Sequence, residues 1–163
     1  MQSEFLIKML HRLKKMGIHT AIDTSGYAPS EIFCKVVSIT DLVLFDLKIA
    51  EIRKHKTYTG TDNSIIHQNL RYLLQSEIPM RIRIPLVNSI TADNHNIERL
   101  QKLLTGRNMI DIDLLSYHDL GKGKREKMGM GTNGNKLTAP DPERLAEIRR
   151  IFDPEIFNVN LGG

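Results

Sequence analysis

The sequence predicts an α/β fold in which helices and parallel strands alternate along the chain. Segments with apolar residues at helical spacing alternate with short apolar segments that are typical of strands. One of these, residues 41–48, is almost continuously apolar, which is typical of a strand covered on both faces of a parallel sheet. Because parallel strands are joined by helical crossovers, the alternation indicates repeated βα units.

The helices are predicted from apolar spacing and from residues that favour helix ends. Phe5, Met9 and Leu13 follow one another at four-residue intervals and predict an initial helix. Asn63 is a common N-cap residue, and we expect its side chain to cap the helix that carries Leu70. The helices expected on these grounds span residues 3–16, 31–37, 51–57, 63–74, 93–104 and 140–152.

The strands are predicted from short apolar runs between turn-forming residues. They are expected at residues 18–22, 41–48, 80–87, 110–118 and 157–161. Residues 121–138 are rich in Gly, Lys and Asn and have little periodicity, so they are predicted to form a mobile loop. A chain of 163 residues is of the length of one domain, and we expect residues 1–163 to form a single unit.

Composition narrows the class of protein. An apolar fraction of 40% is too high for a disordered chain, and the net charge is only +4. Aromatic residues are not interleaved with the basic ones, so no nucleic-acid partner is expected. No apolar run suits a bilayer span or a signal peptide, and Cys34 alone cannot form an intramolecular disulfide. These features favour a cytoplasmic protein without a membrane partner.

Polar side chains gather where the expected strands end. They are Asp23, Thr24, Asp46, Lys48, Arg83 and His118. Ligands of parallel α/β folds bind at the carboxyl ends of the strands, so we expect a binding cleft there. Lys48 and Arg83 would meet a carboxylate, Asp23 an ammonium group, hydroxyls or a cation, and His118 a sugar or heterocycle. This chemistry suits an amino-acid-bearing nucleotide, and many other polar metabolites equally well.

Several segments resemble, in order and spacing, segments of the glycyl-radical-enzyme activating enzymes, the family of pyruvate formate-lyase activating enzymes and their relatives. They are Gly17–Tyr27, Asp41–Lys48, His55-Lys56 with Thr59-Gly60 and Asn63, Arg81–Leu86 and Leu114–Gly121. Each motif is only moderately specific, but together they cover most of the chain. The resemblance implies the C-terminal half of a partial (βα)6 barrel of the radical S-adenosylmethionine (SAM) type.

The resemblance also implies an activity and a set of site residues. Members of the family use a [4Fe–4S] cluster to cleave SAM, and the resulting radical takes a hydrogen atom from a glycine of a partner, the glycyl radical enzyme. Asp23, Thr24, Lys48, Arg83 and His118 match positions that contact SAM or shape its pocket. Asp23 and Asp46 match positions that hold a monovalent cation. Residues 121–138 correspond more loosely to sequence near the substrate side.

The sequence departs from the family where the cluster would bind. The CxxxCxxC loop and the Gly-Gly-Glu motif are both absent, and Cys34 alone cannot supply the cysteine ligands of a cluster. We therefore expect a truncated barrel domain that begins just beyond these motifs, holds no cluster and performs no radical chemistry alone. Ser116 also stands where many relatives have proline.

Other functional hypotheses remain open. One is a non-catalytic module that binds SAM, a related metabolite or a protein. The other is an unrelated α/β barrel enzyme. A half barrel would also expose a sheet edge beside residues 18–22. Exposed edges pair with other chains, so we expect self-association through that edge or through the apolar inner face of the sheet.

Overall fold

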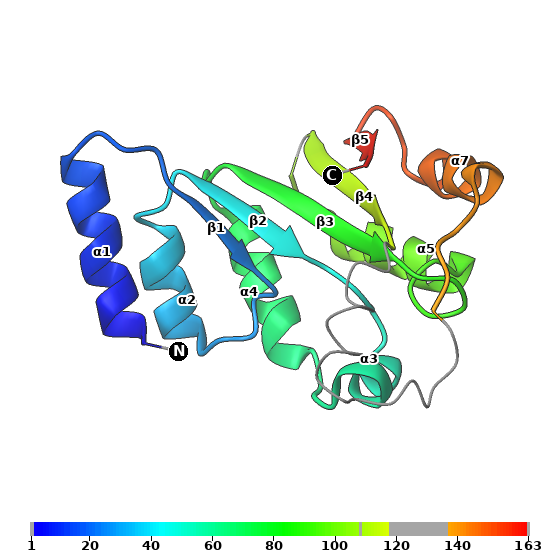
Figure 1. Cartoon of the computed structure of the whole chain (residues 1–163), viewed down its shortest axis with the longest axis horizontal. Helices are drawn as coiled ribbons and strands as arrows, with labels where there is room; N and C mark the ends of the chain where they lie inside the picture. The colour runs from blue at the N-terminus through cyan, green and yellow to red at the C-terminus, as the bar shows by residue number, and fades with distance from the viewer. Residues whose placement is uncertain (1, 108, 118–136, 163) are drawn as a thin grey trace, which may run out of the picture.

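The computed structural model describes residues 2–107, 109–117 and 137–162. Helices and strands alternate along most of the chain, as the sequence predicts (Figure 1). In chain order the elements are α1 (Ser3–Lys15), β1 (Ala21–Thr24), α2 (Ser30–Val37), β2 (Leu42–Asp46), α3 (Ile52–Thr59), α4 (Ser64–Gln75), β3 (Met80–Leu86), α5 (Asn94–Leu103), β4 (Ile110–Ser116), α7 (Pro142–Ile151) and β5 (Phe157–Leu161).

The described strands form one five-stranded sheet in the order β1-β2-β3-β4-β5. Every neighbouring pair is parallel, which confirms the predicted α/β fold with flanking helices. In the view of Figure 1, α4 and α5 lie behind the sheet and α1 and α2 lie beside β1, and within the described ranges no helix lies in front of the sheet. We call this front side the open face.

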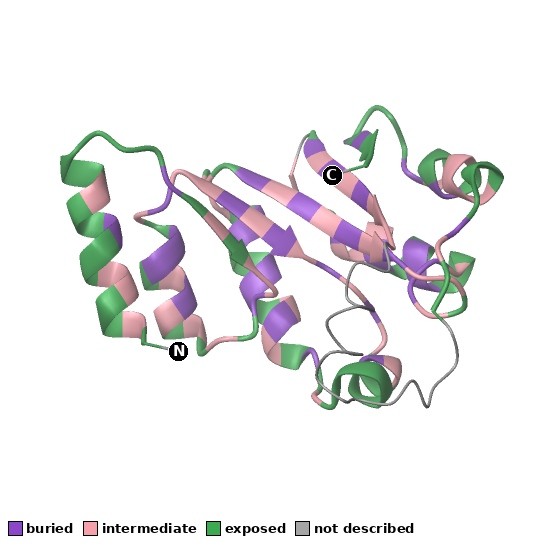
Figure 2. Ribbon diagram, viewed as in Figure 1, coloured by how far each residue is buried: buried purple, intermediate pink, exposed green. Residues whose placement is uncertain are grey.

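The core lies between the sheet and its helices. In β3 the residues Met80, Ile82, Ile84 and Leu86 are buried, and the residues between them are only half-buried. Figure 2 shows the same alternation along β2, β3 and β4. Since strand side chains alternate between the two faces, the buried set packs on the helices and the other set lies on the open face.

Burial contradicts the expectation that the strand in residues 41–48 is covered on both faces. Val43 and Phe45 are fully buried, whereas Leu42, Leu44 and Asp46 are only half-buried. Among the residues that the structure describes, helices cover only one face of β2. The apolar residues on the open side made the sequence look like that of a strand buried on both faces.

The first strand lies later in the chain than predicted: it spans Ala21–Thr24 rather than residues 18–22. Thr20 donates to Asp41 Oδ2 from its backbone N–H at 2.7 Å and from Oγ1 at 2.8 Å. These hydrogen bonds lower the pKa of Asp41. They fix the start of the β1–β2 pairing and leave Ile18 outside the sheet and exposed.

Asn63 has a role other than the predicted helix cap. It stands at the N-cap position of α4, but its side chain makes no capping hydrogen bond. Its Nδ2 instead donates to the carbonyl oxygens of Ile49 at 2.8 Å and Ala50 at 3.1 Å. Asn63 therefore ties the start of α4 to the segment that follows β2.

Some predictions fall outside the described residues, including His118 and residues 121–136 of the expected loop. Within the described ranges, no helix has both the length and the apolar character needed to cross a membrane.

Candidate functional site

Arg83 connects two strand-end carboxylates on the open face. Its Nη1 lies 2.8 Å from Asp23 Oδ2, and its Nε donates to Asp46 Oδ1 at 2.9 Å. Lys48 Nζ lies 3.2 Å from the other carboxylate oxygen of Asp46. The structure thus brings Asp23, Arg83, Asp46 and Lys48 together in one chain of ion pairs, as their positions at strand ends predict.

The register of the sheet produces this arrangement. Asp46 is the direct partner of Arg83 in the β2–β3 pairing, and Asp23 is the partner of Leu44, which lies two residues before Asp46. Partners in a parallel pair point to the same face, so the three side chains project from the open face.

The two carboxylates further favour the charged form of Arg83. Its partial burial alone would lower its pKa, but the negative charges of Asp46 and Asp23 outweigh this and raise the pKa of Arg83. The Arg83 side chain is 23% exposed and that of Asp46 is 21% exposed, so this pair is only partly screened by solvent.

Thr24 supports the turn that follows β1. Its Oγ1 accepts a hydrogen bond from the Gly26 N–H at 3.0 Å. Gly26 has a φ of +73°, and a Cβ there would lie 2.5 Å from Phe45 Cζ, so the position requires glycine. The buried Asn69 holds the turn from α4, since its Nδ2 donates to the Gly26 carbonyl oxygen at 2.8 Å.

A cavity of about 290 Å³ opens beside the ion pairs. We call it the β2 pocket, because the residues that follow β2 form much of its wall. It is lined by Ser25, Tyr27, Asp46, Leu47, Lys48, Ile49, His55, Thr59, Thr61 and Ile66. An apolar wall with a few polar groups is typical of sites for small ligands. A larger hollow of about 690 Å³ contains none of the predicted site residues, and its lining includes Arg149, Arg150 and Phe157.

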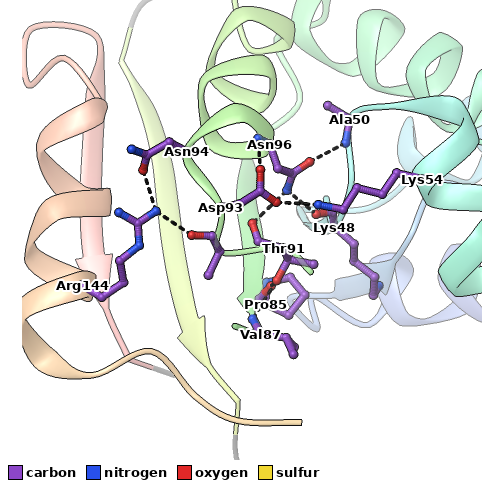
Figure 3. A network of polar contacts seen from close by, with 11 residues as sticks. Lys48, Ala50, Lys54, Pro85, Val87, Thr91, Asp93, Asn94, Asn96 and Arg144 are labelled. Carbon is purple, nitrogen blue, oxygen red and sulfur yellow. Dashed lines mark hydrogen bonds and ion pairs between the residues drawn. The ribbon is translucent and has the colours of Figure 1, made fainter. Parts of the chain in front are cut away.

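Asn96 of α5 holds the Lys48 backbone in place (Figure 3). Its Nδ2 donates to the carbonyl oxygens of Lys48 at 3.0 Å and Thr91 at 2.9 Å. Its Oδ1 accepts from the Ala50 N–H at 2.9 Å. Asn96 is only 3% exposed, so these hydrogen bonds form away from water and fix residues on both sides of Ile49.

The same network anchors α3 and α7. Asp93 caps α5 by accepting from the Asn96 N–H at 2.9 Å, and it also pairs with Lys54 of α3. Arg144 of α7 donates to the Ala92 carbonyl oxygen at 2.7 Å and to Asn94 (Figure 3). The segments after β2 and β3 are therefore tied to their neighbouring helices.

A second charged cluster lies elsewhere on the open face. Arg81 Nη1 lies 3.0 Å from Asp113 Oδ1, and its Nη2 lies 3.7 Å from Asp111 Oδ2. Asn158 donates to Asp111 at 2.7 Å. Asp111, Asp113 and Asn158 were not among the predicted site residues, although the alternation of polar and apolar residues in β4 could have indicated their face.

The residues present fit a [4Fe–4S] cluster poorly. Cys34 is the only cysteine of the sequence, and it lies half-buried in α2. Across the described part of the chain, no group of three or more His, Cys, Asp and Glu residues could hold a metal ion. Asp23 and Asp46, predicted to hold a monovalent cation, share the guanidinium of Arg83.

The chain is similar to activating enzymes of glycyl radical enzymes. It is 36% identical over 162 residues to the trans-4-hydroxy-L-proline dehydratase activating enzyme of Clostridioides difficile, covering 98% of this chain and 54% of that protein. It is 29% identical over 163 residues to the pyruvate formate-lyase 2-activating enzyme of Escherichia coli K12, covering 56% of that protein. The chain therefore spans about half the length of these curated relatives.

Solved structures agree with this relationship. A domain of the pyruvate-formate lyase-activating enzyme from Bacteroides vulgatus superposes with a TM-score of 0.82 at 31% identity, covering 99% of this chain and 91% of that domain. A radical SAM methyltransferase from Sphaerobacter thermophilus shares the fold, with a TM-score of 0.57 at 13% identity. No profile of a protein family matches the sequence. The similarity to the Bacteroides vulgatus domain extends over nearly all of both chains, and this chain belongs to the family of glycyl-radical-enzyme activating enzymes.

Proposed function

We propose that the chain is a SAM-binding portion of an activating enzyme that generates a glycyl radical on a partner enzyme. The observation that carries this proposal is the ion-pair chain from Asp23 through Arg83 and Asp46 to Lys48, beside the β2 pocket. This cluster offers positive groups for the carboxylate of an amino-acid ligand and negative groups for its ammonium group. It lies at the edge of the sheet where parallel α/β folds bind ligands.

Lys48 and Arg83 are proposed to bind the carboxylate of SAM. An ammonium group has three N–H donors, so Lys48 can contact Asp46 and a ligand carboxylate together. Asp23 is 56% exposed and is proposed to accept from the ammonium group of the ligand. Thr24 supports the turn beside the pocket, and His118 is proposed to complete the site.

Asp23 and Asp46 are proposed to bind a monovalent cation together with the ligand. Both carboxylates contact Arg83, so the cation would share them with the guanidinium. The carboxylate of the ligand would add negative charge, which favours a second cation at this place.

The chain is not expected to hold the iron–sulfur cluster or to cleave SAM alone. Clusters of this type take several cysteine thiolates, and the sequence contains only Cys34. In the complete enzyme the cluster would supply the electron for SAM cleavage. The partner is proposed to be a glycyl radical enzyme, by analogy with the relatives, and the place of action to be the cytoplasm.

Calorimetric titration of the chain with SAM tests the proposal. We expect Lys48→Met and Asp23→Asn to weaken binding, whereas Lys35→Met, which removes an exposed lysine that does not line the β2 pocket, leaves it unchanged. If the chain alone does not bind, the titration is repeated with a polypeptide that supplies the remaining half of the Clostridioides difficile relative. Absence of binding in both experiments would refute the proposal.

A second candidate function is a non-catalytic SAM- or metabolite-binding or protein-binding module. The single cysteine favours it, because a module of this kind needs no cluster. The two functions differ in one outcome. A portion of an enzyme forms 5′-deoxyadenosine when the missing half, a reduced cluster and SAM are supplied, whereas a module binds SAM and forms none.

A further inference from the structure

His55 is a buried side chain that the proposed SAM contacts leave unused. It is the buried residue of the short helix α3 and is only 6% exposed, yet it lines the β2 pocket together with Asp46 and Lys48. Buried polar groups are costly unless they are hydrogen-bonded. The partners of each ring nitrogen therefore show which group His55 can offer a ligand.

Contacts at Nδ1 fix the tautomer of His55. This nitrogen lies 2.8 Å from the Thr61 carbonyl oxygen and 2.9 Å from Thr59 Oγ1. A carbonyl oxygen can only accept, so Nδ1 carries the proton in the Thr61 contact. In the neutral ring Nε2 is then unprotonated, and it can only accept a hydrogen bond.

The Nε2 atom of His55 lacks a hydrogen-bond partner among the described residues. No residue in the described part of the chain bonds to it, and it is absent from the fully buried atoms without partners, which are Ser30 Oγ, Asn63 Oδ1 and Asn69 Oδ1. Nε2 thus has no partner within the described residues. His55 lines the β2 pocket, so a ligand in that cavity is the partner considered for this nitrogen.

We propose that His55 Nε2 accepts a hydrogen bond from an uncharged hydroxyl or amino group on the nucleoside part of the ligand. This inference rests on the proposed SAM binding. Lys48 and Asp46 both line the pocket and pair with each other, so the two charges offset and the pocket does not call for a charged donor. Leu47, Ile49 and Ile66 give the pocket an apolar wall that suits the carbon skeleton of a nucleoside.

Two substitutions separate this role from a purely structural one. His55→Asn keeps a donor near the position of Nδ1, which preserves the bond to Thr61, and removes the acceptor at Nε2. His55→Gln extends far enough to place an oxygen near the position of Nε2. His67→Asn is the matched control, because His67 of α4 does not line the pocket. Each variant is first checked for cooperative unfolding.

The experiment is a titration of the chain with SAM, with 5′-methylthioadenosine, which lacks the amino-acid group, and with methionine, which lacks the nucleoside. We expect His55→Asn to weaken SAM and 5′-methylthioadenosine binding by roughly 3- to 10-fold, the effect of one hydrogen bond. Methionine binding should be unchanged, and His55→Gln and His67→Asn should stay close to the unsubstituted chain. The ¹⁵N resonance of His55 Nε2 should also shift when 5′-methylthioadenosine binds.

The outcomes separate this inference from the proposed function. If SAM binds and His55→Asn binds 5′-methylthioadenosine as the unsubstituted chain does, the inference is wrong and the proposed function stands. An unchanged Nε2 resonance on binding would overturn it equally, even if His55→Asn failed to fold. If the unsubstituted chain binds none of the three ligands, with or without the missing half, both proposals fail.

Discussion

Arg83 lies between Asp23 and Asp46 and contacts both, with Nη1 2.8 Å from Asp23 Oδ2 and Nε 2.9 Å from Asp46 Oδ1. Arg83→Met keeps most of the side-chain volume and leaves two like charges facing each other. We expect the free energy of unfolding to fall by roughly 1–3 kcal/mol, measured by urea denaturation.

The control for Arg83→Met is Lys35→Met, which removes a solvent-exposed pair with Glu31 and should change the free energy of unfolding much less than Arg83→Met does. Equal losses in the two variants would show that the position of Arg83 between the carboxylates has no special energetic role. Combining Arg83→Met with Asp23→Asn should recover part of the loss, because the substitution relieves the repulsion.

Gly26→Ala should destabilise the protein by more than the strain of a positive φ alone. The new Cβ would lie 2.5 Å from Cζ of the fully buried Phe45, and φ is +73°. We expect a loss of roughly 2–4 kcal/mol in thermal or urea unfolding. Gly60→Ala is the matched control, since Gly60 has φ +82° with no atom within 4 Å of the added Cβ.

The Gly60→Ala control should lose only about 1 kcal/mol, the strain of a positive φ. Replacing Phe45 by Leu in the Gly26→Ala background should restore part of the difference by making room. Similar losses for Gly26→Ala and Gly60→Ala would show that the turn after β1 can move away from Phe45.

Asn96→Ala should free the segment that carries Lys48. The substitution removes the bonds to the Lys48 and Thr91 carbonyl oxygens and to the Ala50 N–H. We expect a loss of roughly 2–4 kcal/mol, since buried partners are left unsatisfied. Hydrogen exchange should accelerate at Ala50 N–H more than in β4, whereas Asn94→Ala, which removes a bond to Arg144, should leave Ala50 unaffected.

Stability should depend on His67 near neutral pH. Burial lowers the pKa of His67 below its usual value of 6.5, and the nearby His55 and Arg71 lower it further. The unfolded chain therefore binds a proton more readily than the folded one. The stability that neutral His67 provides is fully present above pH 6.5 and is lost as the pH falls through the lower folded pKa.

Urea denaturation at about pH 7.5 and about pH 5.5 tests this expectation. His67→Gln keeps an acceptor for Asn63 Nδ2, which lies 3.1 Å from His67 Nε2, and removes the titration. The substituted protein should lose less stability on acidification. The lowered pKa values of Asp41 and Asp93 affect a more acidic range, below their usual 3.8, so they do not obscure the comparison.

We expect the chain to self-associate through the free edge of β1. β1 pairs only with β2 within the described sheet, and Ile18 just before it is 43% exposed. Light scattering at increasing concentration should show a rising mass, and Ile18→Lys together with Ala21→Lys should suppress it. A constant monomer mass at high concentration would contradict this expectation.

The sequence predicts the strand-end residues well because parallel register brings such positions to one edge. Asp46 ends an apolar run and Arg83 lies between the isoleucines of the next strand, and the parallel register makes the two residues direct partners. Asn96 and His55 were not predicted as parts of the site. A buried polar residue on an amphipathic helix has the same spacing as an exposed one, and only the tertiary fold shows which carbonyl oxygen it meets.

The shifted start of β1 has a similar cause. Apolar residues from Ile18 onwards predict a strand, but the bonds from Thr20 to Asp41 decide where pairing begins. Residues 21 positions apart make these contacts, so local patterns do not contain them. Likewise, Asn63 is of a residue type that is common at N-caps. Its side chain donates instead to the carbonyl oxygens of Ile49 and Ala50.

The division of β3 between two faces also protects the fold against misassembly. Met80, Ile82, Ile84 and Leu86 face the helices, and Arg81 and Arg83 lie between them. A slip of one residue against β2 or β4 would turn both guanidinium groups into the apolar layer and the isoleucines into water. The penalty for burying two unpaired charges makes such states short-lived during folding. Arg81 and Arg83, which bring the carboxylates together, thus also favour the correct register of the sheet.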